Sequence, residues 1–359
     1  MTEEIPRGFR IAYPRGYWYV ACASRELGSR PLARTILDVP LVLFRGAAGM
    51  PSALVDRCAH RNLPLSVGRV AGGELECAYH GWRFDPSGRC RHVPALVDVA
   101  ERKGRAVPSY PVVEQQGYVW VYAEAGAAPE TTPPLFPHLD APGYGSARFE
   151  AEVEATLYAT LENMLDVPHT SFLHRTLFRQ NPQRSITAII RRTADRVEAE
   201  YVGEPRPSGL VAKILAPHAG GGAGESAPPA VEHYDRFLLP SIAQVEYRLG
   251  NSHLAVTNAA TPVTDFRTRF FSVVAFRLPM PAVLVRAVVS PIVRRIFRQD
   301  AWVLRLQTEA VRRAGRESFV STEADVLGPH IWRLLREAAE GGPATADDAA
   351  FERRIELRI

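Results

Sequence analysis

The chain has 359 residues, of which 46% are hydrophobic and 23% are charged, and its formal net charge is +4. Because acidic and basic residues are interspersed along the chain, the charge pattern argues against a nucleic-acid-binding protein. The length and apolar content are sufficient for two domains with cores of their own.

The segments that most resemble targeting or membrane sequences do not fit those roles. Residues 1–20 open with acids and contain no apolar run before a small-residue cleavage site, so the sequence predicts no secretory signal and a cytoplasmic protein. Residues 279–297 are apolar but are interrupted by Arg286, Pro291 and Arg294, which leaves no membrane span. We interpret this stretch as a helix packed on its own domain, with a lipid-contacting amphipathic helix as the alternative.

Short segments rich in β-formers, separated by glycine and proline, fill residues 16–124. They begin with "YWYVACA" and end with "GYVWVYAEAG", which predicts an all-β module within residues 1–125. Five prolines between residues 126 and 145 predict an interdomain linker. A second domain is then expected over residues 146–359.

The most informative stretch is "CAHRNLPLSVGRVAGGELECAYHGW", at residues 58–82. It contains the pairs Cys58-x-His60 and Cys77-x-x-His80. Four cysteines in a chain of this size do not indicate a disulfide scaffold, so metal binding is the alternative. A Cys2His2 zinc site is one interpretation. Zinc fingers, however, group cysteines with cysteines and histidines with histidines, whereas each pair here offers one of each.

This mixed donation suits a cluster whose two irons differ, because two cysteines then bind one iron and two histidines bind the other. That arrangement is a Rieske [2Fe-2S] site. Residues 61–76 leave room for a hairpin that returns the second pair beside the first. Glycine permits the tight turns required there, and the stretch contains Gly68, Gly72, Gly73 and Gly81.

A second motif, "ENMLDVPHTSFLH" at residues 162–174, brings His169 and His174 close together in sequence. A helix is expected over residues 157–167, and its spacing places Glu162, Asp166 and His169 on one face. Each histidine alone is equally well explained by a structural role. Oxygen activation at a mononuclear iron(II), however, needs two histidines and one carboxylate with open positions opposite them. The carboxylate would come from a distant segment.

The remaining pattern predicts an antiparallel sheet flanked by helices, so the chain is classed as α+β. Residues 203–230, rich in glycine, alanine and proline, are interpreted as a mobile loop or lid. Strands are expected over residues 185–193, 196–203, 237–249, 252–263 and 267–278, and further helices over residues 300–314 and 329–339.

With both motifs assembled, the chain resembles the Rieske non-haem iron oxygenases over most of its length. Its N-terminal domain is most similar to the monooxygenase and demethylase branch, which includes pheophorbide a oxygenase and vanillate O-demethylase. The resemblance implies a Rieske domain followed by a helix-grip, START-like catalytic domain. It also implies that Cys58 and Cys77 bind one iron and His60 and His80 the other. Cys22 and Cys90 then lie outside the cluster, as buried or loop thiols.

For the mononuclear Fe(II), the resemblance implies His169 and His174 as ligands. A late carboxylate completes the set in the family, at the start of a helix and followed by glutamine, and Asp300 with Gln307 matches this pattern. Asp265 and Asp325 are the alternatives for this third ligand.

Asp166 matches the bridging carboxylate of the family, which holds an iron-bound histidine and reaches a Rieske histidine of a neighbouring subunit. The alternative is an ordinary surface carboxylate at a helix end. Asn163 is expected to face the iron without binding it. Glu162 is interpreted as a solvated helix residue or an interchain contact.

These implications define a function. An external ferredoxin, an NAD(P)H-dependent reductase or both would deliver electrons to the Rieske cluster and then to the mononuclear iron of a homotrimer. There O2 would oxidise a small organic substrate, aromatic or polycyclic, by hydroxylation or by O- or N-demethylation. The alternatives are a Rieske electron carrier without turnover, a ring cis-dihydroxylating dioxygenase, and a scaffold or regulatory subunit.

The sequence does not identify the substrate. Met164, Phe172, Val245 and Phe270 are candidates for the pocket wall, but their spacing is equally that of a core.

Overall fold

The computed structural model describes residues 13–97, 102, 104–174, 185–204, 231–341 and 351–358. The chain forms two compact units. The N-terminal unit consists of residues 15–135 with 261–264, and the C-terminal unit contains residues 136–260 and 265–359. From residue 205 onward, the loop expected over residues 203–230 lies outside the described residues.

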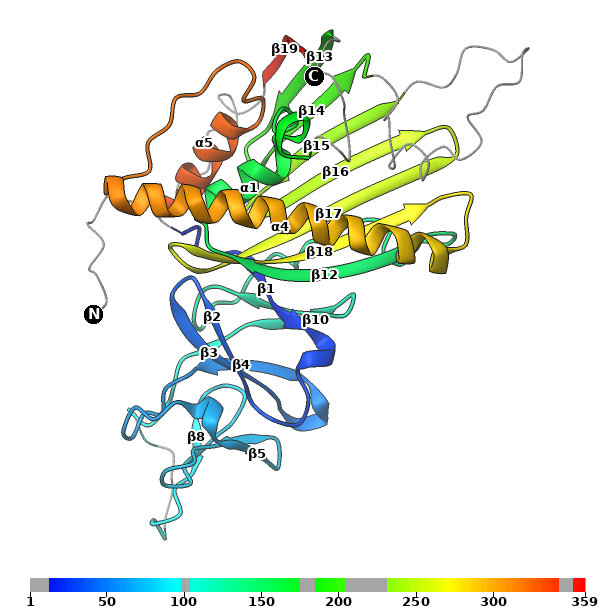
Figure 1. Ribbon diagram of the computed structural model, residues 1–359. Coiled ribbons are helices and arrows are strands. Elements are labelled where there is room, and N and C mark those ends of the chain that lie inside the picture. The colour runs from blue at the N-terminus through cyan, green and yellow to red at the C-terminus, as the bar shows by residue number, and fades with distance from the viewer. Residues whose placement is uncertain are drawn as a thin grey trace. The chain divides into compact units, whose positions relative to one another are not determined.

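Three small sheets build the N-terminal unit, which confirms the all-β prediction (Figure 1). The first has the order β1-β11-β10, the second β2-β3-β4-β9 and the third β5-β6-β7-β8. Strands β5 and β6 of the third sheet come from the middle of the 58–82 motif, and β7 directly follows it. The strands are β1 (Trp18–Ala23), β2 (Leu32–Ile36), β3 (Val39–Arg45), β4 (Pro51–Val55), β5 (Arg69–Ala71), β6 (Glu74–Glu76), β7 (Arg83–Phe84), β8 (Cys90–His92), β9 (Ser109–Tyr110), β10 (Val112–Gln115) and β11 (Tyr118–Tyr122).

An eight-stranded sheet forms the C-terminal unit, in the order β12-β18-β17-β16-β15-β14-β13-β19. Helices α1, α4 and α5 cover one face of it (Figure 1), which confirms the antiparallel sheet flanked by helices. We call this helix-covered side the inner face. The elements are β12 (Gly145–Val153), α1 (Leu157–Leu165), α2 (Thr170–Leu173), β13 (Ser185–Arg192), β14 (Arg196–Val202), β15 (Glu232–Leu238), β16 (Ile242–Leu249), β17 (Ser252–Thr264), β18 (Arg267–Arg277), α4 (Ala282–Ala314), α5 (Gly328–Ala339) and β19 (Phe351–Arg358).

Alternation along the strands explains why the sheet buries this face. On β15, His233, Asp235 and Phe237 are buried while the residues between them are more exposed. The buried residues of β13 to β16 pack against Leu161 and Leu165 of α1 in one large core cluster. Because successive strand side chains point to opposite faces, a single register fixes which residues the helices cover.

Helix α1 begins and α4 ends at recognisable signals. The Thr156 hydroxyl accepts a hydrogen bond from the N–H of Ala159 at 3.1 Å, which caps the first turn of α1. Gly315 adopts the left-handed conformation that terminates α4. Helix α4 carries Asp300, and α1 leads into the short helix α2, which His169 and His174 flank.

The structure differs from the sequence prediction at three places. The strand expected over residues 237–249 is divided between β15 and β16, because Pro240 has no N–H to donate to a neighbouring strand. The edge strands β12 and β19 were not predicted. Helix α4 joins the apolar stretch at 279–297 to the helix expected from residue 300, despite Pro291, so Asp300 lies within a helix rather than at its start.

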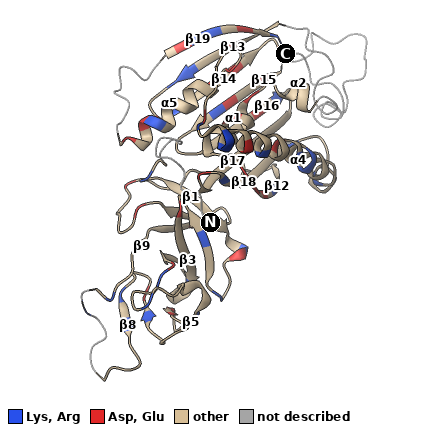
Figure 2. Ribbon diagram, turned by 60° about the vertical axis from the view of Figure 1, so that its left-hand side comes forward, with Lys and Arg blue, Asp and Glu red and all other residues tan. Residues whose placement is uncertain are grey.

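Basic residues recur along α4 and include Arg294, Arg295 and Arg298 (Figure 2). They alternate with apolar side chains that pack on the sheet, including Val285 and Leu304. The interpretation of residues 279–297 as part of a helix packed on its own domain is therefore confirmed. Within the described residues, no helix meets the length and hydropathy needed for a membrane span.

Candidate metal centres

Two turns of the N-terminal unit carry the predicted cluster ligands, and the backbone folds both in the same way. The N–H groups of Cys58 and Cys77 each donate at 2.8 Å to the carbonyl five residues later. The N–H groups of Asn62 and Gly81 each donate back to the cysteine carbonyl four residues earlier at 3.0 Å. Asn62 and Gly81 are both left-handed, with φ of 61° and 68°. We call these two equivalent turns the knuckles.

Within the knuckles, the thiols are buried and the imidazoles lie nearer the surface. Cys58 and Cys77 are 1% and 2% exposed, whereas His80 is exposed and His60 is half-buried. The two imidazole rings lie 4.5 Å apart between centroids. The Nδ1 atom of His60 is buried and has no hydrogen-bond partner among the described residues. An orphaned imidazole nitrogen beside a second imidazole and two buried thiols fits a Rieske cluster.

The surroundings of the knuckles are apolar and aromatic. The Trp82 ring stacks on His60 at 4.7 Å between centroids. Burial raises the pKa of the Cys58 thiol to about 11, so binding of iron must displace a proton from it. Cys22 and Cys90 are also buried but lie outside the knuckles, as expected.

Gly68 serves the hairpin between the knuckles by close approach and not by a left-handed turn. Its φ is −84°, which any residue adopts. A Cβ atom at this position would lie 2.0 Å from the backbone oxygen of Glu76. The hairpin therefore requires glycine here because the two backbones touch.

Gly81→Ala is expected to reduce cluster content. Alanine in the left-handed region costs about 1–2 kcal/mol, and its Cβ atom would lie 2.9 Å from Cγ of Pro94. The measurement is the visible Rieske absorbance per protein, together with its rate of bleaching in air. Gly28→Ala is the matched control, because no atom lies within 4 Å of the added Cβ there. Equal cluster content in both variants would contradict this account of the knuckle.

In the C-terminal unit, the structure brings together the predicted mononuclear ligands His169, His174 and Asp300. Their nearest donor atoms all lie within 4.8 Å of one another. Nε2 of His174 is 2.9 Å from Oδ1 of Asp300, and Nε2 of His169 is 3.8 Å from the same oxygen. His174 is 2% exposed, whereas the other two are partly exposed. Two imidazoles and one carboxylate converging from different segments match the donor set of non-haem iron(II).

Two neighbouring side chains orient the histidines of this triad. The Asp166 carboxylate accepts a hydrogen bond from the His169 backbone N–H at 3.1 Å, and the same Oδ2 lies 3.2 Å from Nδ1 of His169. Nδ1 of His174 lies 2.9 Å from Oε1 of Gln299. Both contacts leave the Nε2 atoms turned toward Asp300. Gln299 was not predicted, although it directly precedes Asp300, whereas Gln307 of the predicted pattern is exposed.

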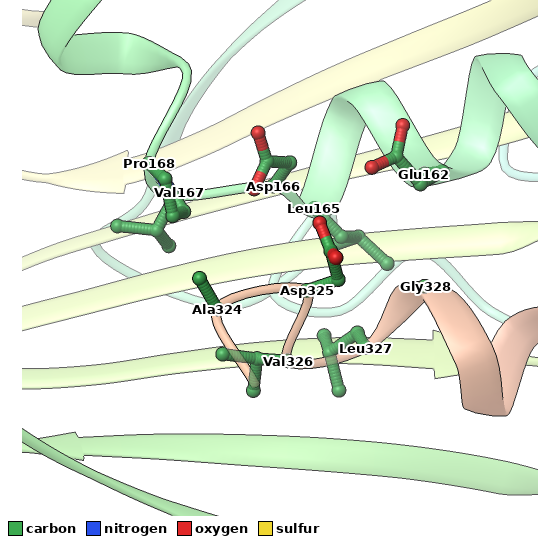
Figure 3. A pocket seen from close by; sticks show the side chains of 10 residues that line it. All are labelled: Glu162, Leu165, Asp166, Val167, Pro168, Ala324, Asp325, Val326, Leu327 and Gly328. Atoms are coloured by element: carbon green, nitrogen blue, oxygen red, sulfur yellow. The ribbon is translucent and has the colours of Figure 1, made fainter. Parts of the chain in front are cut away.

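The other predicted residues of α1 lie beside a small pocket, not at the triad itself. Glu162, Asp166 and Asp325 turn carboxylates toward this pocket (Figure 3). Burial raises the pKa of Glu162 to about 7, and the nearby charge of Asp166 adds to the effect. Glu162 is half-buried, so it is not a fully solvated helix residue, and its interpretation as an interchain contact stays a prediction. Asn163 is half-buried on α1, one turn before Asp166.

The alternative carboxylates have other partners. Asp265 accepts a hydrogen bond from the Tyr13 hydroxyl at 2.9 Å. Asp325 accepts one from the backbone N–H of Thr322 at 2.5 Å. Asp300 is the predicted third ligand that the structure places beside the two histidines. Among the pocket-wall candidates, Met164, Val245 and Phe270 pack in the core, whereas Phe172 is 70% exposed.

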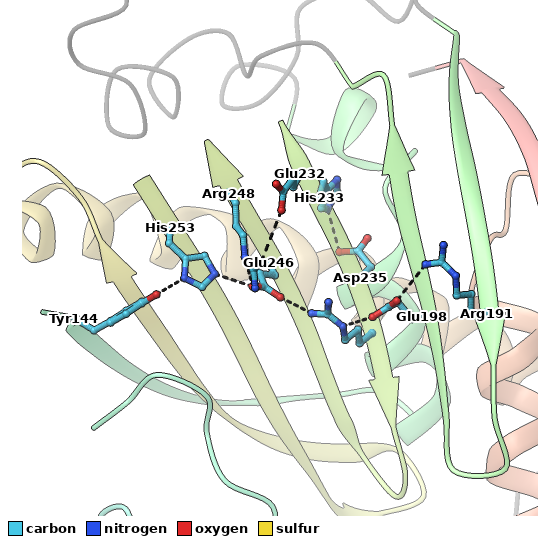
Figure 4. A network of polar contacts seen from close by, with 10 residues as sticks. Tyr144, Arg191, Glu198, Glu232, His233, Asp235, Glu246, Arg248 and His253 are labelled. Carbon is cyan, nitrogen blue, oxygen red and sulfur yellow. Dashed lines mark hydrogen bonds and ion pairs between the residues drawn. The ribbon is translucent and has the colours of Figure 1, made fainter. Parts of the chain in front are cut away.

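A second group with metal-ligating atoms, His138, Glu246 and His253, lies elsewhere in the unit. Glu246 and His253 already take part in a polar network across β14 to β17 (Figure 4), and the His138 ring packs against His253. Arg236 and Arg248 both contact the Glu246 carboxylate, and the two ring nitrogens of His253 lie within hydrogen-bonding distance of Tyr144 and Glu246. We interpret this group as a structural network, because two guanidinium groups already compensate its carboxylate.

A buried ionic cluster occupies the inner face of β15. Nδ1 of His233 lies 2.6 Å from Glu204, and Nε2 lies 3.1 Å from Asp235. The ring is also stacked between Tyr201 and Tyr247. Burial alone would lower the pKa of His233, but the charges of Asp235 and Glu204 and hydrogen bonds to them raise it to about 9.

His233→Gln is expected to lower Tm most below about pH 6.5. Because the pKa of His233 is raised from about 6.5 in the unfolded chain, its stabilisation is complete below about pH 6.5. It is lost as the pH rises through about 9. The difference in Tm between wild type and variant should therefore shrink by roughly 5–10 °C between pH 6.5 and 9.5. A difference that does not vary with pH would show that His233 is buried uncharged.

Two family models match the chain, and each covers one of the two sets of predicted metal ligands. Residues 17–111 match the family model of the Rieske [2Fe-2S] domain. Residues 153–341 match that of the vanillate O-demethylase oxygenase C-terminal domain. The chain belongs to the Rieske oxygenases. As a member of this family it carries a Rieske 2Fe-2S cluster and a mononuclear iron, and the two sets of side chains described above fit these groups.

Individual Rieske oxygenases are similar over part or most of the chain. The dicamba O-demethylase oxygenase component of Stenotrophomonas maltophilia is 37% identical over 167 residues, which are 46% of this chain and 49% of that protein. The vanillate O-demethylase oxygenase subunit of Pseudomonas sp. is 28% identical over 275 residues, 71% of this chain and 73% of that protein. The chain thus spans about half the length of several curated relatives it matches.

The fold is shared over a longer stretch than the sequence. The crystal structure of dicamba monooxygenase bound to dicamba has a TM-score of 0.75 and 25% sequence identity. The match covers 92% of this chain and 98% of the other. The α+β architecture predicted from the sequence is therefore that of solved Rieske oxygenases.

Proposed function

We propose that this protein is the oxygenase component of a multi-component monooxygenase that hydroxylates or demethylates an aromatic or polycyclic compound. The observation that carries the proposal is the open set formed by His169, His174 and Asp300, in a chain whose other unit bears the two Rieske knuckles. When bound, the cluster supplies single electrons and the iron(II) supplies a site for O2.

Each predicted ligand and each residue that orients a ligand has a proposed role. We assign Cys58 and Cys77 to one cluster iron and His60 and His80 to the other, and His169, His174 and Asp300 to the mononuclear iron. Asp166 fixes the His169 ring through Nδ1, and Gln299 fixes the His174 ring. The opposite side of the triad then stays open for O2 and substrate. We also propose that Asn163 faces the mononuclear iron without binding it.

The partners follow from the same assignment. We propose that a ferredoxin, an NAD(P)H-dependent reductase or both reduce the cluster, because no Gly-x-Gly-x-x-Gly nucleotide motif is present in the sequence. We further propose a homotrimer, in which Asp166 connects a Rieske histidine of one subunit to His169 of the next. Sedimentation equilibrium tests the trimer, and a monomer at working concentration would overturn it. The cytoplasmic location and the division at residues 125 and 145 remain predictions.

The decisive experiment measures iron and acid-labile sulfide on protein purified without oxygen. The two irons of the cluster plus one mononuclear iron should give three irons and two sulfides per chain. EPR of the reduced protein should show a Rieske signal, and ferredoxin and reductase should support O2 uptake with methoxylated aromatic compounds. Two irons and two sulfides after iron loading, with no O2 uptake, would identify an electron carrier instead.

A further inference from the structure

Two buried polar atoms on the inner face have no hydrogen-bond partner among the described residues. They are Oδ1 of Asn258 on β17 and Oγ of Ser272 on β18. The two side chains are 4% and 0% exposed. A buried polar group without a partner is destabilising, and most such groups in proteins are paired. A bound ligand or partner would supply the missing hydrogen bonds of these two atoms.

The strand register places both groups on the inner face, on two neighbouring strands. Asn258 lies opposite Ala243 of the helix-covered core cluster. Val256 and Val274 pack in one cluster under α4. Asn258 follows Val256 by two residues and Ser272 precedes Val274 by two, and β17 and β18 are neighbours joined by a tight turn. The amide and the hydroxyl therefore lie on the same face of two adjacent antiparallel strands.

Aromatic contacts connect this polar pair to the iron site. Ser272 lies opposite Phe149 on β12 and two residues after Phe270 on its own strand. The rings of Phe149 and Phe270 lie 6.4 Å and 4.9 Å from the ring of Phe297, measured between centroids. Phe297 is on α4, one turn before Asp300. The polar pair therefore lies in an aromatic environment one layer from a ligand of the mononuclear iron.

We propose that Asn258 and Ser272 form a substrate subsite that binds a hydroxyl group of an uncharged, otherwise apolar compound; this rests on the proposed function. The Asn258 carbonyl oxygen accepts a hydrogen bond, and the Ser272 hydroxyl donates one. A hydroxyl group satisfies both at once. A carboxylate offers acceptors alone, so it cannot donate a hydrogen bond to Asn258.

Thermal stability tests the subsite without knowledge of the substrate. Asn258→Leu and Ser272→Ala each remove a buried oxygen that has no partner among the described residues, so the Tm of the substrate-free protein should stay equal or rise. Gln244→Leu is the matched control, since Gln244 adjoins Ala243 but points to the other face of β16. A fall in Tm for both subsite variants would show that the two groups stabilise the fold, and would overturn the proposal.

Calorimetric titration of the iron-loaded protein tests the recognition of hydroxyl. The probes are 4-methoxyphenol, 1,4-dimethoxybenzene and 4-methoxybenzoate, which differ in one substituent. Wild type and Gln244→Leu should bind the phenol roughly 10- to 100-fold more tightly than the diether. Each subsite variant should lose this preference.

Failure of the subsite and failure of the proposed function give different results. Equal affinity for all three probes, a preference for the benzoate, or no binding of the phenol would overturn the subsite while the iron count stays intact. A protein that does not retain the mononuclear iron would instead overturn the proposed function.

Discussion

Asp300→Ala is expected to remove the mononuclear iron and O2-dependent turnover while leaving the Rieske spectrum unchanged. The carboxylate lies 2.9 Å from Nε2 of His174 and is the one acid that the structure places beside both histidines of the triad. Loss of a residue that hydrogen-bonds to a metal ligand lowers metal affinity about 10- to 100-fold. Loss of a ligand should lower it further. Iron per chain should fall from three to two, with sulfide unchanged.

Gln307→Ala on the same helix is the matched control. Gln307 is exposed, and the sequence pattern had paired it with Asp300. This variant should retain all of its iron and its turnover. If Asp300→Ala keeps its mononuclear iron with undiminished affinity, Asp300 is not the third ligand.

Asp166→Asn should leave both metal centres occupied and slow electron transfer between them about 10- to 100-fold. The carboxylate holds the His169 ring through its backbone and Nδ1 contacts. An amide keeps an oxygen for the backbone N–H but replaces the negative charge beside the ring. Rapid freeze-quench EPR would follow the loss of the reduced-cluster signal after exposure to O2.

Glu162→Gln provides the comparison for this measurement, because Glu162 lines the same pocket as Asp166. It should transfer electrons at nearly the wild-type rate. Wild-type kinetics in Asp166→Asn would remove Asp166 from the electron path, and with it the reason for proposing contact between subunits at this residue.

The Rieske motif was predictable because its chemistry is local. The cysteine and histidine of each knuckle lie within three residues of each other, and a β-turn sets their geometry. Glycine at position 81 also indicated a left-handed turn. Asn62 supplies the same conformation in the first knuckle and was overlooked, although asparagine is the residue that most often replaces glycine there.

The mononuclear site was predictable in part. His169 and His174 follow one helix closely, so their proximity is a local property. The choice of Asp300 over Asp265 and Asp325 came from resemblance to a family, since no spacing rule connects residues more than a hundred positions apart. Packing of α4 against the sheet is what brings Asp300 to the histidines.

The sequence by itself determined the two kinds of metal chemistry, the all-β module and the strands and helices with clear periodicity. Tertiary structure alone decided the contact of Gln299 with His174, the partial burial of Glu162 and the placement of Asn258 and Ser272 on one face of adjacent strands. The physical reason is that residues close together in the sequence determine the types of metal ligand and the conformation of the turns. Burial and cross-strand neighbours depend on register and on which helix covers which face.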